Sequence, residues 1–203
     1  MFPVTTQVLL LSYLNLLIIN VIIIVAGAKK VIGIEYSEEI ASMARKIITK
    51  NGYGDRIHII QGQMESVVLP LSNDESIDII VSEWMGYGLY FENMLPSVMF
   101  ARDKYLRPKT GVILPNTANL FVQGISSSAS EDRVSWWGNV EGFDFSDLAE
   151  LVTVDAQVQI VESRDVLTSR CLFHTLDITT AVNNDLDFER PFEMVRFYYH
   201  FDF

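Results

Sequence analysis

One short segment carries two glutamates whose spacing could support chemistry. Residues 82–95 read SEWMGYGLYFENML, with Glu83 directly after an apolar run and Glu92 further along the chain. Gly86 and Gly88 allow the chain between them to turn tightly, so the two carboxylates can face each other. Carboxylates in apolar surroundings repel each other unless a cation, a shared proton or a metal joins them. A planar guanidinium suits such a pair, because its donors reach both carboxylates at once.

Other interpretations of this segment stay open at the level of sequence. Glu83 can simply be solvated while Glu92 stabilises a helix start through the helix dipole. A metal site is less favoured, since the segment contains no histidine or aspartate. Paired carboxylates also serve in retaining glycosidases, but nothing in the sequence indicates an extended sugar cleft. On local features alone, the solvated and helix-capping interpretation is favoured over a cation pocket. The pocket would have apolar and aromatic neighbours around the acids: Trp84, Met85, Tyr87, Tyr90 and Phe91.

Two further acids follow apolar runs that precede this segment. Glu35 ends the run VIGI, and in a nucleotide-binding sheet an acid at the end of the second strand accepts hydrogen bonds from ribose hydroxyls. Glu65 follows the run 57–61, where an acid can reach an adenine amino group. For Glu35 alone a surface glutamate is the favoured interpretation, and Glu65 alone is weak evidence for a site. Together with Glu83 they stand after three successive predicted strands, which is unusual for unrelated surface acids.

These acids require a sheet whose strands end at one edge. The sequence predicts strands at 30–35, 57–61 and 77–82, each short and apolar. A helix is predicted to begin after Ser37, a good N-cap, and a second helix to span Glu92–Leu106. Strands that alternate with helices indicate a parallel α/β sheet, and ligands of such sheets bind beyond the carboxyl ends of the strands.

The pattern changes beyond Gly111. Short β-type segments separated by turn residues predict a barrel or sandwich, with a domain boundary near Pro115. The predicted strands contain VILP, NLFVQGI, VQIV, CLFHTLDI and FEMVRFYYHF. Between them, the acidic and aromatic stretch 135–151 is predicted to be helical or irregular.

Composition limits the class of partner. The 203 residues carry 15 basic and 26 acidic side chains, for a formal charge of −11. Such a chain is a poor general ligand for nucleic acid, whose phosphates require a basic face. An acidic surface instead concentrates cationic partners. The single cysteine, Cys171, excludes an internal disulfide framework and a cysteine-rich zinc cluster.

The N-terminal run Val8–Val25 is unusually apolar. Its eighteen uncharged residues are at the lower limit for a membrane-spanning helix. Lys29 and Lys30 follow the run, so an inserted segment would leave the rest of the chain cytosolic. A core strand followed by a helix is the favoured alternative, and a mis-joined coding segment is another.

Several of these motifs resemble the protein arginine N-methyltransferase family, especially its asymmetric-dimethylating type. They are VIGIEYS, QGQMES, IDIIVSEWMGYGLYFENML and ARDKYLRPKTGVILP, and the resemblance runs from Ala26 to the end of the chain. It implies an α/β fold with a partial Rossmann-like methyltransferase sheet at 26–115. A β-barrel-like substrate domain at 116–203, truncated and with a dimerisation arm near 132–151, would follow. The segment 1–25 stands apart as atypical and hydrophobic.

The resemblance also implies a role for individual residues. Glu83 and Glu92 match the catalytic glutamates that hold the substrate guanidinium, and Met85 and Tyr87 match residues lining the arginine pocket. S-adenosylmethionine is the implied cofactor, with Glu35 on its ribose. Met64 and Glu65 match the adenine contacts, and Met94 matches the methionine beside the reacting methyl group. The implied substrates are arginine-containing proteins, such as glycine-arginine-rich segments or histone tails, and the implied assembly is a homodimer in the cytoplasm or nucleus.

Two departures from the family pattern affect the expected activity. No glycine precedes Gly27, where the family has a glycine-rich turn that lets the backbone approach the cofactor. The chain also ends at Phe203, before the family's threonine-histidine-tryptophan loop. We therefore expect arginine methylation with impaired activity. The alternatives are a non-catalytic dimerisation or arginine-binding partner, and a protein anchored to a membrane through residues 8–25.

Overall fold

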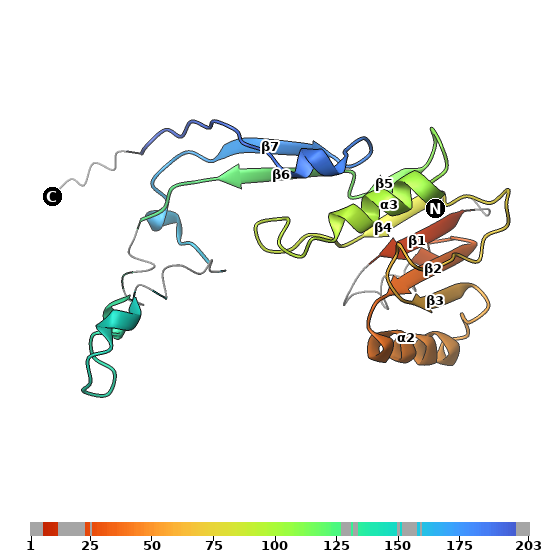
Figure 1. Ribbon diagram of the computed structural model, residues 1–203, viewed down its shortest axis with the longest axis horizontal. Coiled ribbons are helices and arrows are strands. Elements are labelled where there is room, and N and C mark those ends of the chain that lie inside the picture. Colours follow the sequence, from red (N-terminus) through yellow and green to blue (C-terminus); the bar gives the residue numbers. More distant parts are fainter. Residues whose placement is uncertain are drawn as a thin grey trace. The chain divides into compact units, whose positions relative to one another are not determined.

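The structure is a computed structural model that describes residues 6–11, 23–24, 26–126, 131, 134–149, 151, 158 and 160–197 (Figure 1). It divides into two compact units. The first runs to Ala118 and also includes Leu176–Phe188. The second contains Asn119–Thr175 and the residues from Glu189 onward. The predicted domain boundary near Pro115 lies close to the end of the first stretch, and the return of Leu176–Phe188 to the first unit has no counterpart in the prediction.

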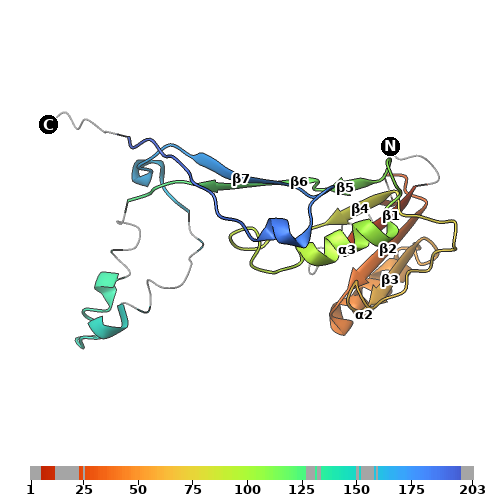
Figure 2. The same ribbon diagram turned by 45° about the horizontal axis from the view of Figure 1, so that its top comes forward.

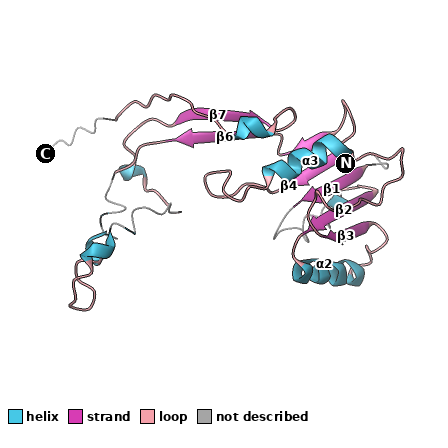
Figure 3. Ribbon diagram, viewed as in Figure 1, coloured by secondary structure: helices cyan, strands magenta, loops and turns pink. Residues whose placement is uncertain are grey.

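The first unit is built on a five-stranded sheet with strand order β3-β2-β1-β4-β5, labelled in Figure 1 and drawn in magenta in Figure 3. Every pairing in it is parallel, as predicted. The strands are β1 Gln7–Leu11, β2 Lys30–Glu35, β3 Ile57–Gln61, β4 Ile79–Ser82 and β5 Val112–Leu114. The prediction for VILP was therefore wrong in one respect: this segment supplies the fifth strand of the parallel sheet rather than the first strand of a barrel.

Strand β1 explains why the N-terminal run is apolar. All five of its residues are buried, because β1 is the central strand and is covered on both faces. Val8 and Leu10 pack with residues of the helix Glu38–Lys50 (α2). Leu9 and Leu11 pack with residues of the helix Leu95–Tyr105 (α3) on the other face (Figure 2). This part of the run is a core strand, the favoured alternative of the sequence analysis.

The remainder of the predicted membrane segment, residues 12–22 and Val25, lies outside the described residues. Within the part of the chain that the structure describes, no helix is both long enough and apolar enough to cross a membrane.

The first residues of α2 and α3 are determined by a capping side chain and by backbone geometry, respectively. Ser37 caps α2 as predicted, its hydroxyl oxygen accepting a hydrogen bond from the Ile40 amide at 3.4 Å. Helix α3 begins at Leu95, later than the predicted Glu92. Asn93 has a φ of 52°, which interrupts helical geometry, and Pro96 occupies the first turn, where proline is tolerated. Glu92 therefore lies in the loop before α3 rather than in its first turn.

The returning segment completes the core beside α3. Leu176, Ile178 and Ala181 are buried in the same cluster as the apolar residues of α3. The amide of Ile178 donates to the carbonyl of Asn116 at 2.8 Å. This segment is thus an integral part of the parallel-sheet unit, although it follows the second unit in sequence.

A separate two-stranded sheet joins β6 Thr117–Val122 to β7 Cys171–Asp177. An isolated bridge at Ile125–Val166 continues this pairing, and another at Thr168–Arg196 joins the segment before β7 to the segment around Arg196. Of the other predicted barrel strands, VQIV is described at residues 158, 160 and 161, which belong to no strand, and the described part of FEMVRFYYHF forms only the bridge at Arg196.

The acidic and aromatic stretch within the second unit is short helix and turn. It contains a helical turn at 134–136 and a 3-10 helix at Ser146–Leu148. Trp136 and Trp137 contact each other edge to face, with ring centroids 4.9 Å apart. Several apolar side chains of this stretch face solvent, among them Trp136, Phe143, Phe145 and Leu151.

Candidate functional site

Strand register places two of the predicted acids on either side of β1. Leu11, the last residue of β1, pairs with Ile34 of β2 and with Ser82 of β4. Glu35 and Glu83 each follow one of these partners, so they stand at the same level of the carboxyl edge. Neighbouring strands lie about 4.8 Å apart, so the backbones of β2 and β4 are separated by roughly 10 Å across β1.

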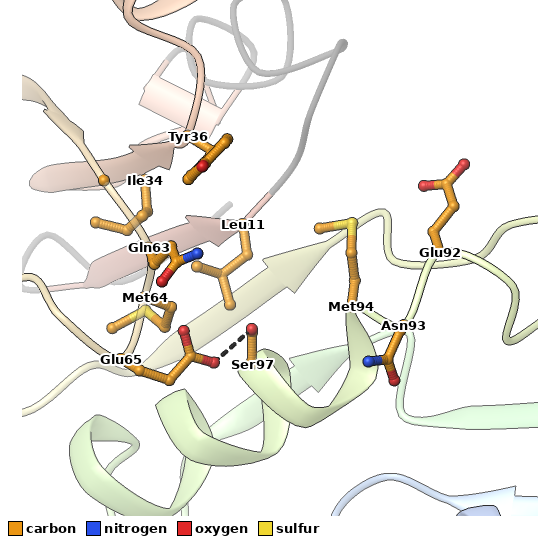
Figure 4. Close-up of a pocket in the computed structure, with 11 residues that line it drawn as sticks. Leu11, Ile34, Tyr36, Gln63, Met64, Glu65, Glu92, Asn93, Met94 and Ser97 are labelled. Atoms are coloured by element: carbon orange, nitrogen blue, oxygen red, sulfur yellow. Dashed lines mark hydrogen bonds between the residues drawn. The ribbon is translucent and has the colours of Figure 1, made fainter.

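A pocket of about 170 Å³ opens at this edge. Its lining comes from the ends of β1 and β2, the turn after β3, and the start of α3 (Figure 4). Four of the predicted site residues line it: Met64, Glu65, Glu92 and Met94. The other four, Glu35, Glu83, Met85 and Tyr87, are not part of its lining.

Glu35 is a buried carboxylate with one oxygen satisfied. It is 1% exposed, and its Oε1 accepts a hydrogen bond from the Ser37 amide at 2.8 Å. Among the described residues, its Oε2 has no partner. Burial raises the pKa of Glu35, and the amides of Ser37 and Tyr36 partly oppose that rise. A buried oxygen that accepts no hydrogen bond lowers the stability of the fold. The hydroxyl groups of a ligand would remove this free-energy cost by donating to it.

The turn after β3 fixes Met64 and Glu65. The Gln63 carbonyl accepts hydrogen bonds from the amides of Ser66 at 3.0 Å and Val67 at 3.1 Å, which closes one helical turn. Met64 is buried and supplies an apolar wall. Glu65 accepts a hydrogen bond at Oε1 from the Ser97 hydroxyl, with an O–O distance of 2.5 Å. The pocket wall therefore links the β3 turn directly to α3.

The segment between the two predicted catalytic glutamates is a tight bend, as the glycines indicated. Gly86 and Leu89 exchange two backbone hydrogen bonds of 3.1 and 3.0 Å. Gly88 has a φ of 56°, which favours glycine. A Cβ at Gly86 would lie 2.6 Å from Cγ of Glu92. The Glu92 side chain therefore folds back against the bend that begins after Glu83.

The carboxylate of Glu92 lies at the rim of the pocket rather than in its interior. In Figure 4, Leu11, Met64 and Met94 point toward the pocket, whereas the carboxylate of Glu92 points away from them. Glu92 is exposed and Glu83 is partly buried. A second pocket of about 140 Å³, lined in part by Trp84 and Met94, adjoins the same bend.

The aromatic residues of the bend separate into a stacked pair, in which Trp84 is buried and Tyr90 partly buried, and an exposed pair. Trp84 is 1% exposed and stacks on Tyr90 with ring centroids 6.1 Å apart, so it belongs to the core. Tyr87 and Phe91 are exposed, with centroids 6.3 Å apart. Trp84 therefore packs in the core with residues of α3, and the exposed rings of the bend are Tyr87 and Phe91.

Two lining residues that were not predicted from the sequence are Leu11 and Ser97. Leu11 forms part of its floor, but the long apolar run hid the end of β1. Ser97 reaches Glu65 from the first turn of α3, and its place just after the start of that helix was the available signal.

The fold and the site together define a class of protein. A parallel sheet with helices on both faces, an acid at the end of the strand beside β1, and a pocket at the carboxyl edge are typical of Rossmann-like nucleotide-binding domains. The predicted α/β fold class is confirmed.

Comparison with known proteins identifies the relatives within that class. Residues 116–197 match the arginine methyltransferase oligomerization subdomain. Protein arginine N-methyltransferase 1 of Dictyostelium discoideum is 42% identical over 170 residues, which are 83% of this chain and 48% of that protein. Protein arginine N-methyltransferase 1.1 of Arabidopsis thaliana is 39% identical over 84% of this chain and 43% of its own length. The predicted family resemblance is confirmed: this chain is a relative of the protein arginine N-methyltransferases.

Solved structures agree with the sequence relatives. The enzyme–prozyme heterotetrameric complex of Trypanosoma brucei PRMT1 with AdoHcy has a TM-score of 0.79 and 37% identity, covering 94% of this chain and 59% of that one. Arabidopsis thaliana protein arginine methyltransferase 10 has a TM-score of 0.71 and 25% identity, over 90% of this chain and 57% of that one. The chain spans about half the length of the curated relatives it matches.

Proposed function

We propose that this chain transfers methyl groups from S-adenosylmethionine to the guanidinium nitrogens of arginine in proteins. The observation that carries the proposal is the bend from Glu83 to Glu92, which begins beside β1 and folds its second glutamate back against Gly86. Both carboxylates thus belong to one short bend next to a nucleotide-type pocket. The names of the relatives point to the same reaction.

The residues at the carboxyl edge suit the nucleoside part of this cofactor. Glu35 offers a buried oxygen, without a partner among the described residues, to ribose hydroxyl donors. Met64 and Leu11 offer apolar surface to a base, and Glu65 offers an acceptor at its edge. Met94 would lie where the nucleoside pocket meets the bend. The AdoHcy named with the related Trypanosoma brucei complex supports this class of cofactor.

The bend would then position the substrate. A guanidinium is a poor nucleophile, because its positive charge is delocalised over three nitrogens. Glu83 and Glu92 would hold two of its edges, orient the third nitrogen and draw positive charge away from it. S-adenosylmethionine supplies an electrophilic methyl group when bound. The exposed Tyr87 and the half-exposed Met85 would contact the apolar stem of the arginine.

We also propose that the chain assembles into a homodimer through the arm near 132–151. The match to an oligomerization subdomain supports this, as do the solvent-facing aromatic residues of that stretch. The net charge of −11 favours arginine-rich protein segments as substrates. Location in the cytoplasm or nucleus stays a prediction.

A second candidate function is arginine binding without catalysis, as a partner of an active enzyme. The described pocket of about 170 Å³ is smaller than the roughly 300 Å³ at which small-molecule sites usually begin. No glycine precedes Gly27, so the backbone there cannot approach a cofactor as closely as a glycine-rich turn would allow. Both observations favour impaired cofactor binding, while the guanidinium-binding bend is retained.

One experiment separates the two functions. Calorimetric titration measures binding of S-adenosylmethionine, and transfer of a radiolabelled methyl group to a glycine-arginine-rich peptide measures activity. We expect Glu92→Gln to reduce transfer by about 100-fold while leaving cofactor affinity within about twofold, since loss of one oriented charge costs about 3 kcal/mol. Glu39→Gln, an exposed acid on α2, is the matched control.

A second substitution tests the geometry of the bend. Gly86→Ala places a methyl group against Glu92, which must move away, whereas Gly54→Ala meets only ordinary contact at 3.8 Å. We expect Gly86→Ala alone to impair transfer. Peptide binding without heat from S-adenosylmethionine at millimolar concentration would support the second candidate and contradict the first.

A further inference from the structure

Acidic and basic side chains of the first unit lie at opposite edges of its sheet. At the carboxyl edge, Glu35 is the last residue of β2 and Glu83 directly follows β4. At the amino edge, Lys30 is the first residue of β2 and Arg56 directly precedes β3. The guanidinium of Arg56 donates to backbone carbonyls of the segment before β2, which holds it at that edge. Because the strands are parallel, a ligand at the carboxyl edge meets the acids.

The lining of the pocket at this edge is acidic as well. Among the described residues that line it, the charged ones are Glu65 and Glu92, and none is a lysine or an arginine. Glu65 comes from the turn after β3 and Glu92 from the loop before α3 (Figure 4). Residues 12–22 and 25, which the structure does not describe, contain no basic residue in the sequence. The pocket therefore favours a cation over an anion.

The helix starts at this edge offer an anion few free donors. The amides at a helix N-terminus often bind anions. In α3, however, Pro96 has no amide hydrogen, and the amides of the two residues after it both donate to the carbonyl of Met94, at 3.1 and 3.3 Å. At the start of α2, the amides of Ser37 and Ile40 already donate to side chains of the protein. The positive ends of the two helices therefore do little to offset the acids.

We propose that the pocket selects nucleosides whose sulfur-bearing side group is cationic or neutral, and that a carboxylate on this group weakens binding. The inference rests on the nucleoside part of the proposed function and adds the chemistry of the amino-acid end. S-adenosylmethionine carries a sulfonium, an ammonium and a carboxylate. The acids of this edge attract the two cations and repel the carboxylate, which has no basic partner among the described lining residues.

Decarboxylated S-adenosylmethionine is the ligand that isolates this effect. It keeps the sulfonium methyl group and the ammonium and lacks only the carboxylate, so the preference concerns binding and leaves the proposed reaction unchanged. Calorimetric titration of the full chain compares the two. We expect the decarboxylated ligand to bind about tenfold more tightly at low salt. The difference should shrink in about 1 M sodium chloride, where the screening length is about 3 Å.

A variant of the lining tests the origin of the preference. Glu92→Gln removes one negative charge, and the decarboxylated ligand has one more net positive charge than S-adenosylmethionine. The variant should therefore reduce the preference by about two- to threefold, mainly by weakening the decarboxylated ligand. Asp55→Asn is the matched control, because Asp55 is an exposed acid in the turn before β3, at the amino edge. It should leave the preference unchanged.

The outcomes are distinguishable. Equal affinity for the two ligands, or tighter binding of S-adenosylmethionine, would overturn the inference while the proposed function stands. An effect of Asp55→Asn as large as that of Glu92→Gln would assign the preference to the net charge of the chain rather than to the pocket, and would overturn it too. If neither ligand binds at millimolar concentration, the proposed cofactor itself is wrong and the inference falls with it.

Discussion

Glu35 is a carboxylate that folding removes from water. Its Oε1 accepts one amide hydrogen bond, and burial nonetheless raises its pKa above the ordinary value of 4.5. The folded state therefore binds this proton more tightly than the unfolded chain does. The stability contributed by the group is fully present below pH 4.5 and is lost as the pH rises through the folded pKa.

This linkage predicts the effect of removing the charge. Glu35→Gln keeps a side-chain oxygen for the Ser37 amide and cannot ionise. We expect the variant to be as stable as the unmodified chain near pH 4.5 and more stable at about pH 8, because only the unmodified chain must bury a charge there. Thermal unfolding at several pH values checks this. A constant difference in Tm across that range would contradict it.

At the scale of secondary-structure elements, Arg102 fastens the returning segment to α3. Its Nη1 donates to the carbonyls of Ile178 at 2.7 Å and Ala181 at 2.8 Å, and its side chain is only 10% exposed. The same guanidinium pairs with Asp103, whose side chain is 67% exposed. The two carbonyl bonds are shielded from water, whereas the ion pair is screened by it.

We therefore expect the carbonyl bonds to dominate the contribution of Arg102. Arg102→Met should lower the free energy of unfolding by about 2–4 kcal/mol, because it leaves two carbonyls without their charged donor. Asp103→Asn removes only the exposed ion pair and should cost less than about 1 kcal/mol. Urea unfolding followed by circular dichroism measures both. Equal losses would show that the ion pair, rather than the carbonyl bonds, secures the segment.

The elements differed in how far the sequence could predict them. The strands at 30–35 and 57–61 and the cap at Ser37 were predictable, because each rests on a local pattern of apolar residues and a capping hydroxyl. Strand β1 could not be distinguished within the apolar run 8–25, because a buried strand and part of a longer apolar helix look alike in sequence. The bond between Ser97 and Glu65 was also unpredictable, because it joins elements distant in the chain.

The bend at Glu83–Glu92 illustrates the same division. Its glycines predicted a tight turn, and the turn is present. The direction of the Glu92 side chain depends on packing against Gly86 and on where α3 begins, which Asn93 and Pro96 determine. The sequence therefore predicts the turn and its residue types. The orientation of the side chains cannot be predicted in this way, because it depends on contacts made only in the folded unit.

At the scale of the whole molecule, the exposed aromatic residues of the second unit predict self-association. Trp136 and Phe143 are 56% and 70% exposed. If this stretch is the dimer contact, Phe143→Ser should weaken association by about tenfold or more, since buried aromatic anchors dominate such interfaces. Sedimentation velocity over a range of concentrations measures this. Val68→Ser, at an exposed apolar position of the first unit, should leave association unchanged.

The segment Leu176–Phe188 completes the first unit, and its late position in the sequence affects how this unit folds during translation. Translation delivers α3 and the sheet long before Ile178, because the whole of Asn119–Thr175 must be synthesised in between. At about 5–20 residues per second, the interval is on the order of several seconds. Throughout it, the nascent chain displays the apolar side of α3 to the surrounding solution. A ribosome stalled before Leu176 would therefore hold all five strands of the sheet while the core beside α3 still lacks Leu176, Ile178 and Ala181.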